Sequence, residues 1–216
     1  MAELTLRERK RRRTRQAIIE AAVELFEERG YEGTTVADIA EAAEIGTRTF
    51  FSYFASKEEL LFPESDSRIT AAVEAIATRG PDDRPADVLL RALRNVNRDS
   101  DEMVSRVAAL RLRLIRSVPA VRGRGLQLQL DAQREIARHL CAAYPDELDE
   151  VGAAALVGAF VGAVTGALQV LLETAGDDPA AMSRRLQEAM DAALRPWLRE
   201  QDKLHAQDRS REQTPS

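Results

Sequence analysis

Cysteine and histidine are scarce in this sequence. Its 216 residues include one cysteine, Cys141, and two histidines. A single cysteine excludes an internal disulfide framework and is typical of a reducing cytosol. His139 and Cys141 are two residues apart, a spacing that puts them on different faces of a helix, and no metal-ligand cluster forms. We therefore expect neither a metal nor a cofactor, and we interpret both side chains as structural.

Patterns of catalysis and of export are also missing. The sequence shows no glycine-rich phosphate loop, no serine-nucleophile motif and no paired catalytic carboxylates, so we expect no enzyme. The N-terminal segment is rich in arginine and is not followed by the apolar core of a signal peptide. These absences favour a cytoplasmic protein that works by binding.

Alternating strand-like patterns are almost absent, which predicts an all-α protein. Apolar residues make up 44% of the chain, enough for a substantial core, and charged residues make up 31%. Helical periodicity, with proline and glycine at the breaks, predicts about nine helices. They are expected at about 13–29, in two short pieces within 34–54, from 56 towards 79, and at 85–98, 100–117, 121–144, 146–175 and 179–199.

The stretch from Thr34 to Leu60 has the pattern of two short helices joined by a tight turn. Thr35 can cap the first helix, with Asp38 at the reciprocal position of a capping box. Gly46 is predicted to be the turn or cap residue before the second helix. Apolar residues that recur at helical spacing mark the buried stripe of the first helix: Val36, Ile39, Ala40 and Ala43.

The second short helix has an inward and an outward face. Its spacing turns Phe50, Tyr53 and Phe54 inward and leaves four residues largely outward: Thr47, Arg48, Phe51 and Ser52. Ser56 is predicted to cap a further helix, with Glu59 as its reciprocal partner. Two short helices around a tight turn, with threonine and arginine on the open face of the second, describe a helix-turn-helix that reads the DNA major groove.

The pattern continues on both sides of the two short helices. It is carried by Ile18, Ile19, Glu20, Ala21, Ala22, Phe26, Gly30, Tyr31, Thr35, Val36, Ile39, Ala40, Ala43, Ile45, Thr49, Phe50, Phe51, Tyr53, Phe54, Ser56, Lys57, Glu58, Glu59 and Leu60. In order and spacing these residues resemble the N-terminal domain of TetR-family transcriptional repressors. Family members often have tyrosine in place of Phe51 and a small residue in place of Arg48. Phe51 removes a possible phosphate hydrogen bond, and Arg48 adds a side chain that can reach a guanine edge.

A set of DNA-contacting residues follows from this reading. Arg48 and Thr47 would read base edges, and Thr49 would add an apolar or hydroxyl contact. Phosphates would be held by Thr35, Tyr53 and Lys57. The complete predicted set is Thr35, Gly46, Thr47, Arg48, Thr49, Phe51, Tyr53 and Lys57, together with Arg11, Arg12 and Arg13.

The net charge of −5 does not exclude a DNA-binding protein, because the charge is unevenly distributed. Arg7 to Arg15 contains seven basic residues and one acidic residue. We expect residues 1–12 to form a flexible basic arm that lies in or along the minor groove. The alternative is a solvated run of charge that serves only solubility.

The segment from Val151 to Leu172 has 22 residues without a charge, long enough to span a membrane. It is rich in alanine and glycine and lacks aromatic belts, so a buried helix is the better interpretation. Gly158, Gly162 and Gly166 form a smooth ridge on which another backbone can pack closely. With the family resemblance, this predicts a homodimer interface from the last two helices, Trp197 included. The alternative is the core of a monomer.

Family members commonly bind a small effector in an apolar pocket, which we expect here between the helices of residues 85–175. The predicted lining residues are Arg106, Leu110, Arg113, Gln133 and Gln169. The arginine-rich segment from Arg113 to Arg124 can hold an anionic head group and looks similar to regulators suspected of binding acyl-CoA-type ligands. The alternative is a set of surface arginines paired with nearby acids.

The sequence therefore predicts an effector-responsive transcriptional regulator, a repressor that binds a palindromic operator as a homodimer. Residues 13–62 would form the helix-turn-helix domain, 63–200 the effector-binding and dimerisation domain, and 201–216 a disordered tail. One alternative is a helical protein-interaction module without operator specificity. Another is an enzyme with a vestigial helix-turn-helix.

Overall fold

The computed structural model describes residues 5–63, 65–98, 102–174 and 184–194. Throughout these residues the chain forms helices and loops and no strand, which confirms the all-α prediction. Its elements are α1 (Leu6–Arg29), α2 (Val36–Ala42), α3 (Thr47–Phe51), the 3₁₀ helix η1 (Glu58–Leu61), α4 (Ser65–Ala77), α5 (Pro85–Arg98), α6 (Glu102–Ser117), α7 (Pro119–Ala143) and α8 (Glu150–Thr174). Residues 184–194 are also helical.

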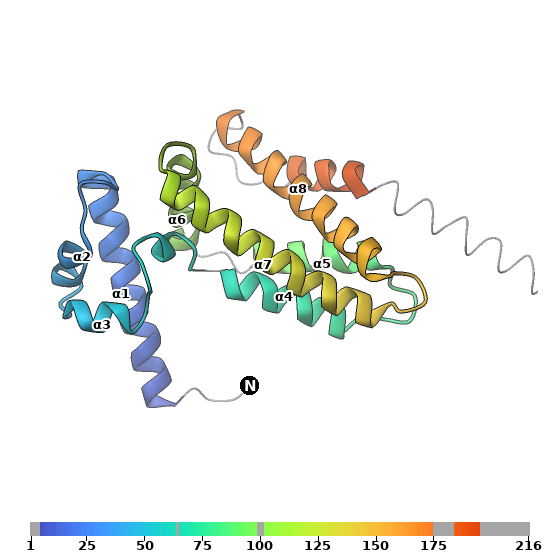
Figure 1. Cartoon of the computed structure of the whole chain (residues 1–216), viewed down its shortest axis with the longest axis horizontal. Coiled ribbons are helices and arrows are strands. Elements are labelled where there is room, and N and C mark those ends of the chain that lie inside the picture. Colours follow the sequence, from blue (N-terminus) through green and yellow to red (C-terminus); the bar gives the residue numbers. More distant parts are fainter. Residues whose placement is uncertain (1–4, 64, 99–101, 175–183, 195–216) are drawn as a thin grey trace, which may run out of the picture. The chain divides into compact units, whose positions relative to one another are not determined.

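The chain folds as two compact units (Figure 1). The first comprises α1 to η1 together with α6 and the beginning of α7, within residues Met1–Ser65 and Ser100–Leu128. The second comprises α4, α5, the rest of α7, α8 and the helix at 184–194, within Asp66–Asp99 and Gln129–Ser216. This division differs from the boundary predicted after residue 62, because α6 contributes its apolar face to the first unit.

The core of the first unit is built around α1. Ile18, Ile39 and Phe50 have no exposed surface, so α1, α2 and α3 each place a fully buried side chain in it. From α6 and the start of α7 the same core receives Val107, Leu110, Val118 and Val121. The three short elements α2, α3 and η1 therefore share one core with α1, α6 and the start of α7.

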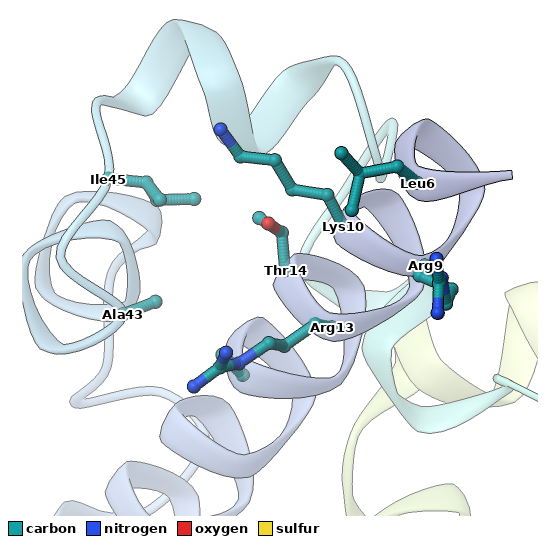
Figure 2. Close-up of a pocket in the computed structure, with 8 residues that line it drawn as sticks. Leu6, Arg9, Lys10, Arg13, Thr14, Ala43 and Ile45 are labelled. Atoms are coloured by element: carbon teal, nitrogen blue, oxygen red, sulfur yellow. The ribbon is translucent and has the colours of Figure 1, made fainter.

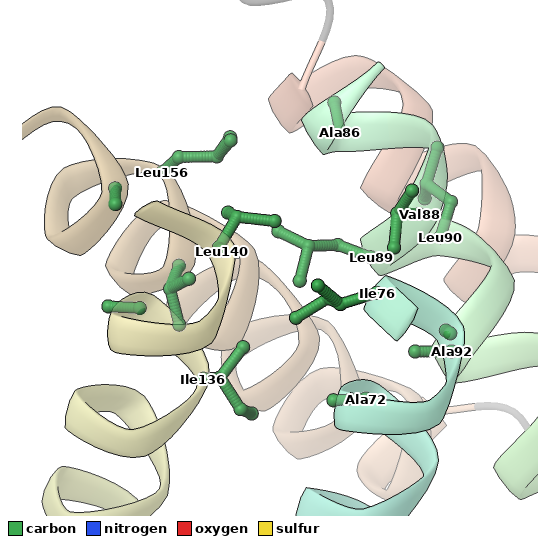
Figure 3. Packing of buried hydrophobic residues seen from close by; sticks show 14 of the residues in the cluster. Ala72, Ile76, Ala86, Val88, Leu89, Leu90, Ala92, Ile136, Leu140 and Leu156 are labelled. Atoms are coloured by element: carbon green, nitrogen blue, oxygen red, sulfur yellow. The ribbon is translucent and has the colours of Figure 1, made fainter. Parts of the chain in front are cut away.

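The second unit has its own core between α4, α5, α7 and α8. Leu89 of α5, Leu140 of α7 and Ile76 of α4 point toward one another in it (Figure 3). Met190 and Leu194, on the helix at 184–194, complete the cluster. The predicted position Trp197 lies outside the described residues, as do residues 201–216.

Two helix starts differ from those predicted. α1 begins at Leu6 and not near Arg13, because Thr5 and Glu8 form a capping box in which each accepts a hydrogen bond from the other's backbone. The arginine run is therefore a helix and not a flexible arm. Ser56 does not cap a long helix, since η1 starts at Glu58 with no side-chain cap. The helix expected from residue 56 towards 79 is interrupted around Pro63: η1 ends at Leu61 and α4 begins at Ser65.

Helix α8 contains a stretch, Glu150–Leu171, that is long and apolar enough to cross a membrane. Only 17% of its most apolar window is buried within the chain, so the expected burial on nearly every side is not found in one protomer. Leu156 and Val157 face the core of the second unit. Val151 and Val170 are more than half exposed, which leaves an apolar face open.

Candidate nucleic-acid interface

The predicted capping box at the start of α2 is present. Thr35 N donates to Asp38 Oδ2 at 2.8 Å, and Asp38 N donates to Thr35 Oγ1 at 3.2 Å. The hydrogen bonds that the Asp38 carboxylate accepts, first from the Thr35 hydroxyl and then from the Thr35 N–H, hold the pKa of Asp38 below its usual value. The Thr35 hydroxyl also donates to Asp38, so its single proton is already used. The geometry thus gives Thr35 a capping role in place of the predicted phosphate contact.

The turn between α2 and α3 depends on a residue that the sequence did not single out. Glu44 has φ 54°, the left-handed conformation that non-glycine residues seldom adopt. Gly46, the predicted turn residue, has an extended backbone and caps α3 with its carbonyl, which accepts from Phe50 N at 3.0 Å. A Cβ atom on Gly46 would meet nothing within 4 Å. Gly46 therefore leaves room at the start of α3 and is not required by the turn.

Helix α3 has the two faces that its sequence predicts. Phe50 and Phe54 are buried, with ring centroids 5.9 Å apart. The outward side chains are Thr47, Arg48, Thr49, Phe51 and Ser52, all exposed. The Ser52 hydroxyl donates to the Thr49 carbonyl at 2.6 Å. Arg48 has no hydrogen-bond or ionic partner among the described residues, so its guanidinium is available to a ligand outside the protein.

The N-terminal turns of α1 lie in the same unit as α3 and carry seven of the eight basic residues of α1. Arg15 lies 4.9 Å from the centroid of the Phe54 ring, and Arg11 lies 6.0 Å from that of Tyr53. On another face of α1, an open groove of about 720 Å³ separates this helix from the α2–α3 turn (Figure 2). The residues lining it are Leu6, Arg9, Lys10, Arg13, Thr14, Ala17, Ala43 and Ile45.

This groove combines apolar side chains with three cations next to the α2–α3 turn. Such a surface suits the DNA phosphate backbone, since lysine and arginine neutralise phosphates without reading the base sequence. Arg13 was predicted as an individual DNA contact, whereas Arg9 and Lys10 were predicted only as part of the basic arm. A threonine followed three residues later by glutamate, Thr5 and Glu8, is the sequence signature of a helix start. It would have shown that the arginine run is helical.

Lys57 has a different role from the predicted one. Its ammonium group donates to the carbonyl of Tyr31 at 2.8 Å and to that of Thr34 at 2.9 Å, and lies 4.0 Å from the centroid of the Tyr31 ring. The Tyr31 hydroxyl in turn donates to Glu58 at 2.6 Å. Burial and this bond raise the pKa of Tyr31. Lys57 therefore ties the α1–α2 connection to η1, and its phosphate contact stays a prediction.

Replacing Lys57 with methionine should lower the free energy of unfolding by about 1–3 kcal/mol, because the two carbonyls lose a charged donor. The salt dependence of DNA binding should not change. Lys10→Met is the matched control: it should leave stability unaltered and reduce the slope of log affinity against log salt by about one. Urea unfolding and DNA titrations at several salt concentrations measure both. A reduced slope with unaltered stability in Lys57→Met would restore the phosphate contact.

The predicted effector residues are not brought together within either unit. Arg106 forms an ion pair with Glu27 of α1, with its Nε 3.2 Å from Glu27 Oε2. Leu110 is buried in the core of the first unit. Arg113 belongs to the same unit. Gln133 and Gln169 belong to the second unit. Arg106 and Leu110 thus attach α6 to the rest of the first unit, and their contact with an effector stays a prediction.

Sequence and structure comparisons place these features among known proteins. Residues 18–62 match the model of bacterial regulatory proteins of the tetR family. The chain is 37% identical over 150 residues to the transcriptional regulator TcmR of Streptomyces glaucescens, covering 67% of this chain and 66% of TcmR. It is 44% identical over 48 residues to HbdR of Aromatoleum sp. (strain CIB), covering 22% of this chain and 21% of HbdR. The chain thus matches slightly less than two thirds of TcmR and about a fifth of HbdR.

Solved structures share the fold. FadR from Thermus thermophilus, a TetR-family repressor in complex with lauroyl-CoA, superposes with a TM-score of 0.56 at 21% identity, covering 85% of this chain and 93% of FadR. NalD from Pseudomonas aeruginosa superposes with a TM-score of 0.55 at 18% identity, covering 87% of this chain and 96% of NalD. TcmR and HbdR are named as regulators and not as enzymes. The match of residues 18–62 to the family model and the 37% identity to TcmR show that the chain belongs to the tetR family of bacterial regulatory proteins.

Proposed function

We propose that this protein is a cytoplasmic transcriptional repressor that binds a palindromic operator as a homodimer and is released by a small effector. The observation that carries the proposal is the outward face of α3, where Arg48 has no partner among the described residues and is flanked by exposed Thr47 and Thr49. An arginine on a recognition helix makes the commonest specific contact in DNA, two hydrogen bonds to a guanine edge. The basic groove beside α1 supplies phosphate contacts.

The open face of α8 supports the homodimer. A Cβ atom added at Gly158, Gly162 or Gly166 would meet nothing within 4 Å in the protomer, so nothing in the described chain requires these three glycines to be small. Close approach of a second α8 would require it, since glycine lets two helix backbones meet. A two-fold axis through this contact would present two copies of α3 one DNA turn apart, about 34–36 Å.

The contacts of α6 and α7 in the first unit suggest how an effector acts. Arg111 of α6 donates to the Leu61 carbonyl at 3.0 Å. Arg124 of α7 forms an ion pair with Glu59, whose other oxygen accepts from Ala55 N at 2.7 Å. Ala55 follows α3 closely, so a displacement of α7 would pull on the recognition helix. The effector must bind the DNA-incompetent state more tightly, and DNA must then weaken effector binding by the same factor.

An acyl-CoA-like effector is the chemistry we propose for the ligand. It rests on the arginines of the α6–α7 segment and on the fold shared with FadR, which is solved with lauroyl-CoA. Of the arginines between Arg113 and Arg124, three already have partners in the chain: Arg122 donates to the carbonyls of Ile115 and Arg116, Arg124 pairs with Glu59, and Arg116 also has an interaction of its own. Arg113 is exposed and is the residue we propose for the anionic head group.

Selection from a random pool of duplexes tests the proposed function. The purified full chain should retain one palindromic sequence at least 1,000-fold more tightly than bulk DNA, the low end for specific DNA-binding proteins. It should sediment as a dimer in the same buffer. A monomer that retains no duplex above competitor DNA would support the alternative, a helical protein-interaction module.

A further inference from the structure

Phe51 is an apolar side chain on the face of α3 that we assign to DNA. It is 56% exposed, although most large apolar side chains of the first unit are buried. Its ring has no hydrogen-bonding group, so it cannot donate to a phosphate oxygen as a tyrosine hydroxyl would. A single exposed apolar side chain needs no partner by itself, but on a face that we assign to DNA this ring packs best against an apolar group.

The ring of Phe51 is also held in place. It meets the ring of Phe50 edge to face, with centroids 5.4 Å apart and an interplanar angle of 85°. Phe50 has no exposed surface, so the partner ring is fixed in the core. Phe51 lies four residues after Thr47 and three after Arg48, positions that neighbour it on a helix surface. The three side chains therefore form one contact surface with a polar and an apolar part.

The major groove offers one apolar group among its base edges, the C5-methyl of thymine. We propose that Phe51 is a specificity-determining residue that packs on the C5-methyl of a thymine in each half-site, near the base pair that Arg48 reads. This inference rests on the proposed function, because it assumes that α3 lies in the major groove. It assigns to Phe51 a base contact in place of the phosphate contact expected from a tyrosine.

The size of the effect follows from the methyl group itself. Removing one buried methyl costs about 0.8 kcal/mol, which is a loss of affinity of about 4-fold. A homodimer makes the contact twice, so removing both symmetry-related methyl groups should cost about 15-fold, the square of that factor. The loss should occur at a single thymine position per half-site and should disappear when the aromatic ring is removed.

The test uses the operator selected by the full-length protein. Deoxyuridine, which lacks only the C5-methyl, replaces thymidine at one symmetry-related pair of positions at a time, and affinity is measured by titration. The wild type should lose about 15-fold at one pair. Phe51→Ala should bind the unmodified operator more weakly and show no further loss at that pair. Phe51→Tyr keeps the ring and should keep the sensitivity.

Thr47→Ser and Thr49→Ser are the matched controls, because each removes one of the two threonine methyl groups that α3 exposes. Sensitivity that persists in Phe51→Ala but is lost in one of the two threonine variants would assign the contact to that threonine and overturn the proposal. So would a Phe51→Ala variant that loses equal affinity for operator and random DNA, since that outcome means contact with the sugar-phosphate backbone. If the wild type selects no sequence, the proposed function itself fails; if it selects one and deoxyuridine has no effect, only the role of Phe51 fails.

Discussion

Replacing Gly162 with leucine is expected to convert the dimer into monomers and to weaken operator binding by at least about 100-fold, the lower end of the gain from joining two binding modules. Gly162 is exposed on α8, and a Cβ atom there would meet nothing within 4 Å in the protomer. The larger side chain therefore fits one chain and obstructs only a second chain that packs on this ridge. Each monomer has one α3 and would bind only one half-site of the operator.

Gly123→Leu is the matched control, because Gly123 is an exposed glycine of α7 that also has nothing within 4 Å of its Cβ position. Both substitutions raise helix propensity by up to about 1 kcal/mol. A difference between the two variants therefore comes from the position of the leucine and not from the glycine-to-leucine change itself. Sedimentation gives the oligomeric state, and operator titration gives the affinity. A Gly162→Leu protein that remains dimeric and binds like the control would place the dimer contact away from the glycine ridge.

The helix-turn-helix was predictable because its signals are local. The capping box of Thr35 and Asp38 and the spacing of the aromatic residues on α3 lie within a few positions of one another. The face of each helix then follows from its 3.6-residue period, and Phe50, Phe54 and Arg48 lie on the predicted sides. Local signals also existed for α1, but the density of arginine between Thr5 and Arg15 favoured the interpretation as a flexible arm.

The attachment of α6 and α7 to the first unit could not be read from the sequence. Arg106 and Glu27 are 79 positions apart, and Arg124 and Glu59 are 65 apart. Any arginine between Arg106 and Arg124 could pair with any of many acidic residues, and the helical period of the sequence does not indicate which pair forms. For the same reason Lys57 was assigned to a phosphate, although two backbone carbonyls of the α1–α2 connection accept its hydrogen bonds.

Replacing Arg48 with alanine should weaken operator binding by about 1–3 kcal/mol per subunit, the value of a bidentate arginine–guanine pair. Affinity for random DNA should fall far less, because a base contact contributes little where no guanine is in register. Folding should be unaffected, since Arg48 is exposed and has no partner among the described residues. Titrations of operator and random duplexes at one salt concentration measure the difference.

Lys10→Ala provides the contrast, because Lys10 lines the groove beside α1 and we assign it to a phosphate. Its loss should weaken operator and random DNA by similar factors and reduce the salt slope by about one unit, since a phosphate contact carries no sequence information. Arg48→Ala should alter the selected sequence at one position of each half-site and leave the slope nearly unchanged. Equal losses on operator and random DNA for Arg48→Ala would move Arg48 from the base edges to the phosphates and leave the recognition of sequence to Thr47, Thr49 and Phe51.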